Sequence, residues 1–276
     1  MPAAALLAVL AAALLHASWN LVVKSSSERL VAATSQIVLA ALVSLPLLLW
    51  RGFPTAALGY LLASAVVQTG YVYSLAAAYD RADLSFVYPL ARGTAPVLIA
   101  LGAMIGLSVA IDGRGWLALA LICGGVIALA VTASSHTGVG WSLLTGVLIA
   151  SYISLDGAGV TTTPDTFAYT AALHAFTGVL LVPLVFTLRG SAQVRIAVRN
   201  EWKRHLVAGA ASLLSYGLLL YASRLAPLSL VAAARETGVV FATLGGWLFL
   251  GETVTRGRVA ASVLIAAGVA VLALGG

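Results

Sequence analysis

Three charged residues lie inside apolar stretches that are long enough to cross a membrane. Arg92 lies in SFVYPLARGTAPVLIAL, and Arg235 and Glu236 lie in LVAAARETGVVFATLGGWLFLGE. A charged side chain at the centre of a bilayer costs about 2.5 to 3.5 kcal/mol on insertion scales, so charges kept at that depth are expected to bind or carry something. These three residues are therefore the first candidates for a functional site.

The two arginines have the chemistry of an anion site. The guanidinium group donates hydrogen bonds from a planar fork, which matches carboxylate and phosphonate oxygens in two places at once. Each arginine lies about seven residues into its span, or about 11 Å deep at 1.5 Å per residue in a core about 30 Å thick. If the spans enter from opposite faces, about 8 Å separates Arg92 and Arg235 along the membrane normal. We expect both to converge on one anionic group; a structural ion pair between Arg92 and Glu236 is the alternative.

Two residues are candidates for proton coupling. Glu236 cannot easily pair with Arg235, because consecutive residues of a helix point about 100° apart, and intramembrane carboxyl groups are common members of proton relays. His16 is the second candidate, and it shares a helix face with Asn20, which we expect to contact substrate. A histidine at this depth can also simply hydrogen-bond to a neighbouring helix.

Tyrosines are expected in two roles. Some would give a cavity an aromatic wall: Tyr71, Tyr88, Tyr152 and Tyr216. Others suit anchoring at the membrane surface, where tyrosine is enriched: Tyr60, Tyr169 and Tyr221.

Composition excludes a soluble domain. Of 276 residues, 61% are hydrophobic and 9% are charged, whereas about a quarter of a soluble domain is charged. The net charge of +6 lies mainly between the apolar segments, so it indicates membrane topology and not nucleic-acid binding. Apolar windows predict an all-α integral membrane protein with ten transmembrane helices, at 3–23, 30–50, 57–79, 85–108, 116–132, 140–159, 166–188, 206–223, 228–251 and 259–274.

The chain repeats itself with an offset of about 143 residues. Arg92 falls on Arg235 and Thr94 falls on Thr237. The repeat divides the chain into units 1–134 and 139–276, each with five spans. Because five is odd, the second unit must enter the membrane inverted relative to the first, and inverted repeats of transporters hold substrate near the midplane between their halves.

Charges in the loops predict orientation. One set of loops carries about ten Lys and Arg and the other about three, so the positive-inside rule places the first set in the cytoplasm and both termini outside a cell inner (plasma) membrane. The basic segment 189–205 has apolar residues at four-residue spacing beside its cations. It is expected to form a short helix on the membrane surface, or an irregular basic loop.

The motifs resemble the EamA family of the drug/metabolite transporter superfamily. The resemblance rests on HASWNLVVKSS and on the two segments around Arg92 and Arg235, and it extends over essentially the whole chain. It implies two five-helix units, a cavity walled mainly by spans 1, 3, 4, 6, 8 and 9, and export or uptake of small metabolites such as amino acids. Spans 5 and 10 would brace the outside or form a homodimer contact. The family's Leu-Gly-Glu signature ends the ninth span at Glu252 but has no acidic counterpart after the fourth, which weakens a role for Glu252 in a symmetric mechanism.

Enzyme motifs do not occur in the sequence. It lacks a Walker-type phosphate loop, HExxH and GxSxG, so we expect no cofactor, no metal and no catalysis. The expected function is secondary active transport of an amino acid, organic anion or phosphonate-like metabolite, by an exporter or exchanger with alternating access. The alternative is a membrane enzyme or a non-transporting accessory protein that holds a lipid in the central cavity.

Overall fold

The described part of the chain is built of α-helices. The computed structural model describes residues 2–107, 112–131, 136–226, 234–235 and 237–274, in which no strand occurs. Most helices begin and end within a few residues of the predicted spans. They are α1 (Ala3–Ser25), α2 (Arg29–Arg51), the 3-10 turn η1 (Thr55–Ala57), α3 (Leu58–Arg81), α4 (Leu84–Leu107), α5 (Gly113–Val131), α6 (His136–Thr161), α7 (Thr166–Arg189), α8 (Ser191–Leu225), α10 (Gly238–Leu250) and α11 (Arg256–Leu274).

The helices are apolar enough for a membrane. Five segments of the described chain have both the length and the composition to cross a bilayer, namely α1, α2, η1 with α3, α6 and α7, and shorter apolar helices include α10. Large apolar side chains also cover the outer surface, such as Leu49 at 75% exposed and Val131 at 80%. A helix that is apolar on all sides needs lipid or protein on all sides, so the chain is a multi-pass membrane protein.

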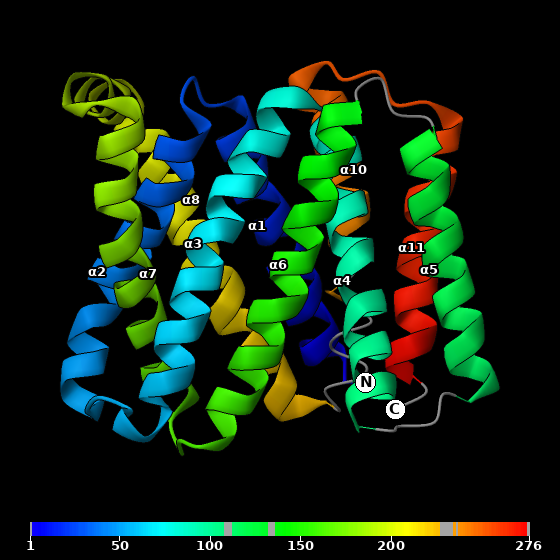
Figure 1. The fold of residues 1–276 in the computed structure, drawn as a ribbon, viewed down its shortest axis with the longest axis horizontal. Helices are drawn as coiled ribbons and strands as arrows, with labels where there is room; N and C mark the ends of the chain where they lie inside the picture. The colour runs from blue at the N-terminus through cyan, green and yellow to red at the C-terminus, as the bar shows by residue number, and fades with distance from the viewer. Residues whose placement is uncertain (1, 108–111, 132–135, 227–233, 236, 275–276) are drawn as a thin grey trace.

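The helices form one elongated bundle (Figure 1). Helices α2 and α7 pack together at one end of its long axis, and α5 and α11 pack together at the other end. Between them, α1 packs on α8, α3 packs on α6, and α4 and α10 complete the middle. The beginning of α1 and the end of α11 lie on the same side of the bundle, and α8 begins on the opposite side.

The turn between α3 and α4 is held by charged groups from two other segments. Lys24 Nζ donates to the carbonyl oxygens of Tyr79 and Ala82 at 2.6 Å each, at the end of α3. Glu252 accepts hydrogen bonds from the amides of Leu84 and Ser85 at 2.6 and 2.9 Å, at the start of α4. A cation at a helix C-terminus and an anion at a helix N-terminus both interact favourably with the helix dipole and stabilise the helix. The family's Leu-Gly-Glu signature thus has a structural role here that the sequence did not indicate.

The basic segment after α7 differs from its prediction. Neither a separate surface helix nor a loop forms, because α8 runs unbroken from Ser191 to Leu225, a stretch that contains no proline. Figure 1 shows its first turns near one edge of the bundle, seen almost end-on. There Val194 and Ala197 are buried, while Trp202 remains 52% exposed. The amphipathic pattern therefore marks the first half of a long helix.

The ninth predicted span is shorter where the structure describes it. Helix α10 begins only at Gly238, and Thr237 before it lies in a turn whose amide bonds to the carbonyl of Ala234 at 3.3 Å. A methyl group added at Gly238 would lie 3.1 Å from the hydroxyl of Tyr88. The close approach of α10 to α4 thus favours glycine at the first helical position. Residues 227–233 of this predicted span lie outside the described residues.

Candidate functional site

A polar cavity of about 270 Å³ lies inside the bundle. Arg92 and Arg235, which come from the two predicted repeats, both line it. Its other polar and aromatic lining residues are His16, Trp19, Gln36, Gln68, Tyr71, Tyr152, Asp156, Tyr169, Thr170, His174, Ser212, Ser215 and Tyr216. Six of the residues predicted to contact substrate, couple protons or line the cavity therefore share one cavity: Arg92, Arg235, His16, Tyr71, Tyr152 and Tyr216.

Aromatic side chains surround the arginine part of the cavity. The guanidinium carbon of Arg92 lies 6.0 Å from the ring centroid of Tyr88, within the range of a cation–π interaction. The rings of Tyr71 and Tyr152 meet edge-on at 5.4 Å between centroids. Such rings provide an apolar boundary that strengthens the attraction between a guanidinium group and an anion, because the local dielectric constant is low.

His16 is held in one orientation by Trp19. The indole nitrogen of Trp19 donates to Nδ1 of His16 at 3.2 Å, and the two rings lie edge-on at 5.1 Å. Since Nδ1 accepts this bond, the neutral imidazole carries its proton on Nε2. His16 therefore has one ring nitrogen engaged within α1 and the other as its proton-bearing atom.

Asn20 and Tyr88 are placed behind the cavity wall. Asn20 is 2% exposed; it donates to the carbonyl of His16 at 2.9 Å and accepts from the hydroxyl of Tyr79 at 2.7 Å. Tyr88 is buried, and its ring lies edge-on to that of His16 at 6.0 Å. Neither is among the described residues that line the cavity. Both instead support residues that do.

An acidic group that sequence reasoning missed lies in the same cavity. Asp156 of α6 accepts hydrogen bonds from the hydroxyl of Tyr169 at 2.8 Å and from the amide of Gln68 at 3.3 Å. The carboxylate is thus held by α3 and α7 while it lines the cavity. The signal was available, because Asp156 is an acidic residue within a predicted span.

The position of Tyr169 differs from its prediction. It was assigned to the membrane surface, but it is buried, at 1% exposed, and lines the cavity. Helix α7 also places Thr170 and His174 there, and α2 places Gln36 there. The walls therefore include α2 and α7 as well as the helices that the resemblance implied. Periodicity could not show this, because these helices are apolar on nearly every face.

The cavity extends toward the side of the bundle on which α1 begins. Arg92 lies near the middle of α4, whereas Tyr169 lies in the first turn of α7, on that side. A smaller cavity of about 120 Å³ shares Thr170, His174, Ser212 and Tyr216 with it and continues to Ser44 and Leu47 of α2. The space lined by Thr170, His174, Ser212 and Tyr216 thus leads from mid-bundle toward the side on which α1 begins.

Glu236 lies outside the described residues. The predicted pairing of Arg92 with Glu236 and the predicted proton-carrying role of Glu236 therefore both stay predictions. What the described residues provide is two arginines, one aspartate and two histidines around one cavity.

Comparison with known proteins decides the family. The model of the EamA-like transporter family matches residues 136–274, just over half of the chain. The chain belongs to the EamA-like transporter family. A solved structure described only as a crystal structure of protein superposes with a TM-score of 0.68 at 17% identity, covering 99% of each chain, so it shows that the EamA chain shares that fold. No curated protein matches the chain. Membership makes this a membrane transporter of the drug/metabolite type.

Proposed function

We propose that this EamA protein is a secondary active transporter that binds an anionic or zwitterionic metabolite between Arg92 and Arg235. The observation that carries the proposal is that both arginines line one cavity inside an otherwise apolar bundle. Two half-buried guanidinium groups that line one cavity favour a carboxylate or phosphonate, because each fork can donate two hydrogen bonds to one anionic group.

Asp156 favours a substrate that also carries a positive charge. Its carboxylate lines the cavity that the arginines line, and its bonds from Tyr169 and Gln68 fix its position. The anionic group of a zwitterion would lie against the arginines, and its cationic group would lie against Asp156. This pairing of opposite charges reduces the cost of removing water from the substrate and from the cavity side chains. The substrate class is therefore a small amino acid or a related amino-phosphonate, ahead of a simple organic anion.

Two inverted repeats, 1–134 and 139–276, would supply the alternating access. The packing pairs support this, since α1 on α8 and α6 on α3 are the same contact if each five-helix unit is exchanged for the other. The family match to residues 136–274 also covers nearly the whole second unit. In the described conformation, the cavity space leads toward the side of the termini, while Lys24 and Glu252 hold the α3–α4 turn on the opposite side.

Orientation and coupling complete the proposal. The positive-inside rule places the α3–α4 turn in the cytoplasm and both termini outside the plasma membrane. His16 or Glu236 would carry the coupling proton, and the transporter would work as an exporter or exchanger. His16 lines the cavity, and to take up the coupling proton its Nδ1 would have to release the hydrogen bond from Trp19, because Nε2 already carries the proton of the neutral ring.

Counterflow in proteoliposomes tests the function. Vesicles loaded with unlabelled amino acids, organic acids or phosphonates would be screened for accelerated uptake of the labelled compound. We expect saturable counterflow for a zwitterion, with empty liposomes as the control. Flux without saturation or counterflow would indicate a channel, and processing of a lipid head group without solute flux would favour the enzyme alternative.

A further inference from the structure

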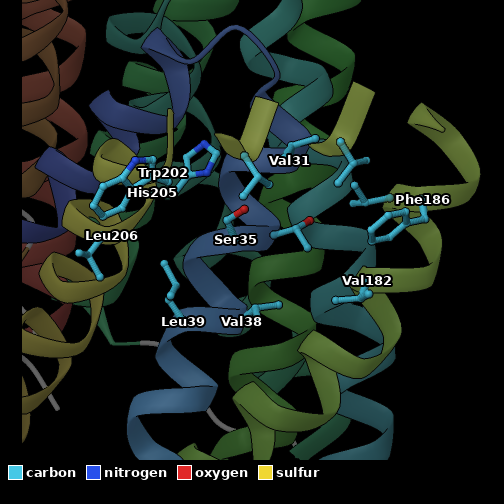
Figure 2. Close-up of a pocket in the computed structure, with 13 residues that line it drawn as sticks. Val31, Ser35, Val38, Leu39, Val182, Phe186, Trp202, His205 and Leu206 are labelled. Carbon is cyan, nitrogen blue, oxygen red and sulfur yellow. The ribbon is translucent and has the colours of Figure 1, made fainter. Parts of the chain in front are cut away.

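A second, apolar recess lies on the outer surface, away from the polar cavity. It is formed by the first turns of α2, the last turns of α7 and the first half of α8, and its volume is about 440 Å³. Figure 2 shows residues of α2 between Trp202, His205 and Leu206 on one side and Val182 and Phe186 on the other. We call this recess, together with its continuation described next, the α2–α8 groove.

The groove is long and runs along the helix axes. A second recess of about 430 Å³ shares Leu39 and Leu206 with the first and continues along α2 to Val43 and along α8 to Gly217. From Val31 to Val43 the groove follows α2 for about 18 Å at 1.5 Å per residue. One leaflet of the hydrocarbon core is about 15 Å deep, half of about 30 Å. The groove therefore has the length and direction of an acyl chain in one leaflet.

Basic residues follow the wall of the groove that α8 forms. Arg195, Arg199 and Lys203 recur at every fourth residue of α8, each directly after a residue that lines the groove. All three are exposed, and none forms an ion pair with another described residue. Lys203 instead lies over the ring of Trp202, with 5.7 Å between its nitrogen and the ring centroid.

The nearby acidic groups are already engaged elsewhere. Glu28 accepts from Arg189 at 3.0 Å and from Gln193 at 2.6 Å, and Glu201 accepts from the amide of Ser27 at 3.0 Å. The three cations of α8 are consequently not neutralised by these carboxylates. A basic helix face beside an apolar one is attracted to anionic lipid.

Two buried polar groups line the groove near its outer end. Neither ring nitrogen of His205 nor the hydroxyl of Thr34 has a hydrogen-bond partner among the described residues. His205 is 2% exposed, and its Nε2 lies 3.7 Å from Glu201 Oε2, too far for a hydrogen bond. A buried polar group without a partner is costly. The glycerol and ester oxygens of a phospholipid would offer acceptors at this depth, between the apolar chain and the charged head group.

We propose that the α2–α8 groove binds one acyl chain of an anionic phospholipid whose phosphate lies against Arg195, Arg199 and Lys203. The site is separate from the polar cavity and does not depend on which substrate the cavity holds. It also gives the first half of α8 a role, because that half forms one wall of the groove and carries the basic face.

Lipid retention by the purified full-length protein tests the proposal. Native mass spectrometry would compare phosphatidylglycerol with phosphatidylcholine of identical acyl chains, at two salt concentrations. We expect a preference of at least tenfold for phosphatidylglycerol that falls as salt rises. Changing Arg195, Arg199 or Lys203 singly to Gln should reduce the preference by up to about fivefold, and changing all three should abolish it. Arg256→Gln, an exposed cation outside the groove, is the matched control and should leave the preference unchanged.

Variants of Val198 test the apolar contact with the acyl chain separately from the contribution of the basic residues. Val198→Trp fills the groove from an exposed position on α8 and should remove retention of both lipids, while thermal stability in detergent checks that the variant is folded. Equal retention of both lipids by the unmodified protein would overturn the proposal, as would an equal effect of Arg256→Gln. Disulfide-linked dimers of Val198→Cys in a Cys123→Ser background would show that a second copy of the chain occupies the groove instead.

Discussion

Gly125 of α5 and Gly268 of α11 make equivalent contacts with each other's helix. A methyl group added at Gly125 would lie 2.7 Å from the carbonyl oxygen of Ala261, and one added at Gly268 would lie 2.8 Å from that of Ala118. The two glycines are 268 − 125 = 143 residues apart, and the two alanines are 261 − 118 = 143 residues apart. The offset found in the sequence thus reappears as a reciprocal contact between α5 and α11.

Reciprocity predicts equal effects of substitution at the two glycines. Gly125→Ala and Gly268→Ala each force a methyl group against backbone atoms, and overpacking of this kind costs about 1 to 3 kcal/mol. Thermal unfolding in detergent should show a similar loss for both. Gly124→Ala is the matched control, because a methyl group there meets no atom within 4 Å. A large loss at one glycine and none at the other would contradict the twofold arrangement.

Glu252 is predicted to act through stability. Glu252→Ala leaves the amides of Leu84 and Ser85 without their acceptor, and an unsatisfied buried donor costs about 1 to 3 kcal/mol. Thermal unfolding should therefore show a clear loss, while the exposed neighbour change Thr253→Ala has little effect. Counterflow per folded molecule should be retained in Glu252→Ala. Normal stability combined with lost coupling would assign Glu252 to transport instead.

Asp165 is predicted to give a pH-dependent contribution to stability. Slight burial opposes its ionisation, but hydrogen bonds from Arg51 and from the amides of Ala168 and Phe167 outweigh it and hold the pKa of Asp165 below its ordinary value. With a depressed folded-state pKa, the contribution is present above the unfolded-state pKa of about 3.9 and is lost as the pH falls further.

Two variants of Asp165 separate the effect of its charge from the effect of its hydrogen bonds to the start of α7. Asp165→Ala should lower the free energy of unfolding by about 1 kcal/mol at pH 7, and the difference from the unmodified protein should narrow as the pH falls below about 3.9. Asp165→Asn keeps an acceptor for the start of α7 and should lose less. Unfolding curves measured from pH 7 to pH 3 provide the check, and a difference that widens at low pH would refute the assignment.

Asp156 is predicted to select for the positive charge of the substrate. Asp156→Asn keeps the shape and one acceptor oxygen but removes the charge, so the affinity for a zwitterion should fall at least tenfold while that for the matching simple anion changes little. Tyr169→Phe removes a hydrogen-bond partner of Asp156 but leaves the charge, and it serves as the control. Unchanged discrimination between the two ligands in Asp156→Asn would exclude this role.

The sequence predicted the helices well because apolar length is a strong local signal. Eight of the ten expected spans correspond to described helices with similar ends, and the other two differ at their starts, Ser191 and Gly238. The surface segment was misjudged because amphipathic spacing indicates a helix face but not where the helix stops. The start of α10 depends on contact with Tyr88 and Ala13, which no local pattern reveals.

The site was predictable only in part. Arg92 and Arg235 could be predicted to face the same site, because the repeat offset and the depth of each residue within its span can both be read from the sequence. Tyr169 was placed wrongly because its position depends on a hydrogen bond between α6 and α7, whereas Asp156 carried a signal in the sequence as an acidic residue within a predicted span. Asn20 was predicted to contact substrate, but its polar side chain forms hydrogen bonds with His16 and Tyr79 behind the cavity wall.

Substrate affinity in counterflow tests the central claim most directly. Arg92→Ala and Arg235→Ala would be reconstituted beside Arg114→Ala, an exposed arginine of α5 outside the cavity, and half-saturation would be measured with one zwitterionic substrate. Loss of a charged hydrogen-bonding partner costs about 1.5 to 3 kcal/mol, so we expect half-saturation to rise at least tenfold in each cavity variant and to stay unchanged in Arg114→Ala. Saturable counterflow with unaltered affinity in both cavity variants would contradict the account.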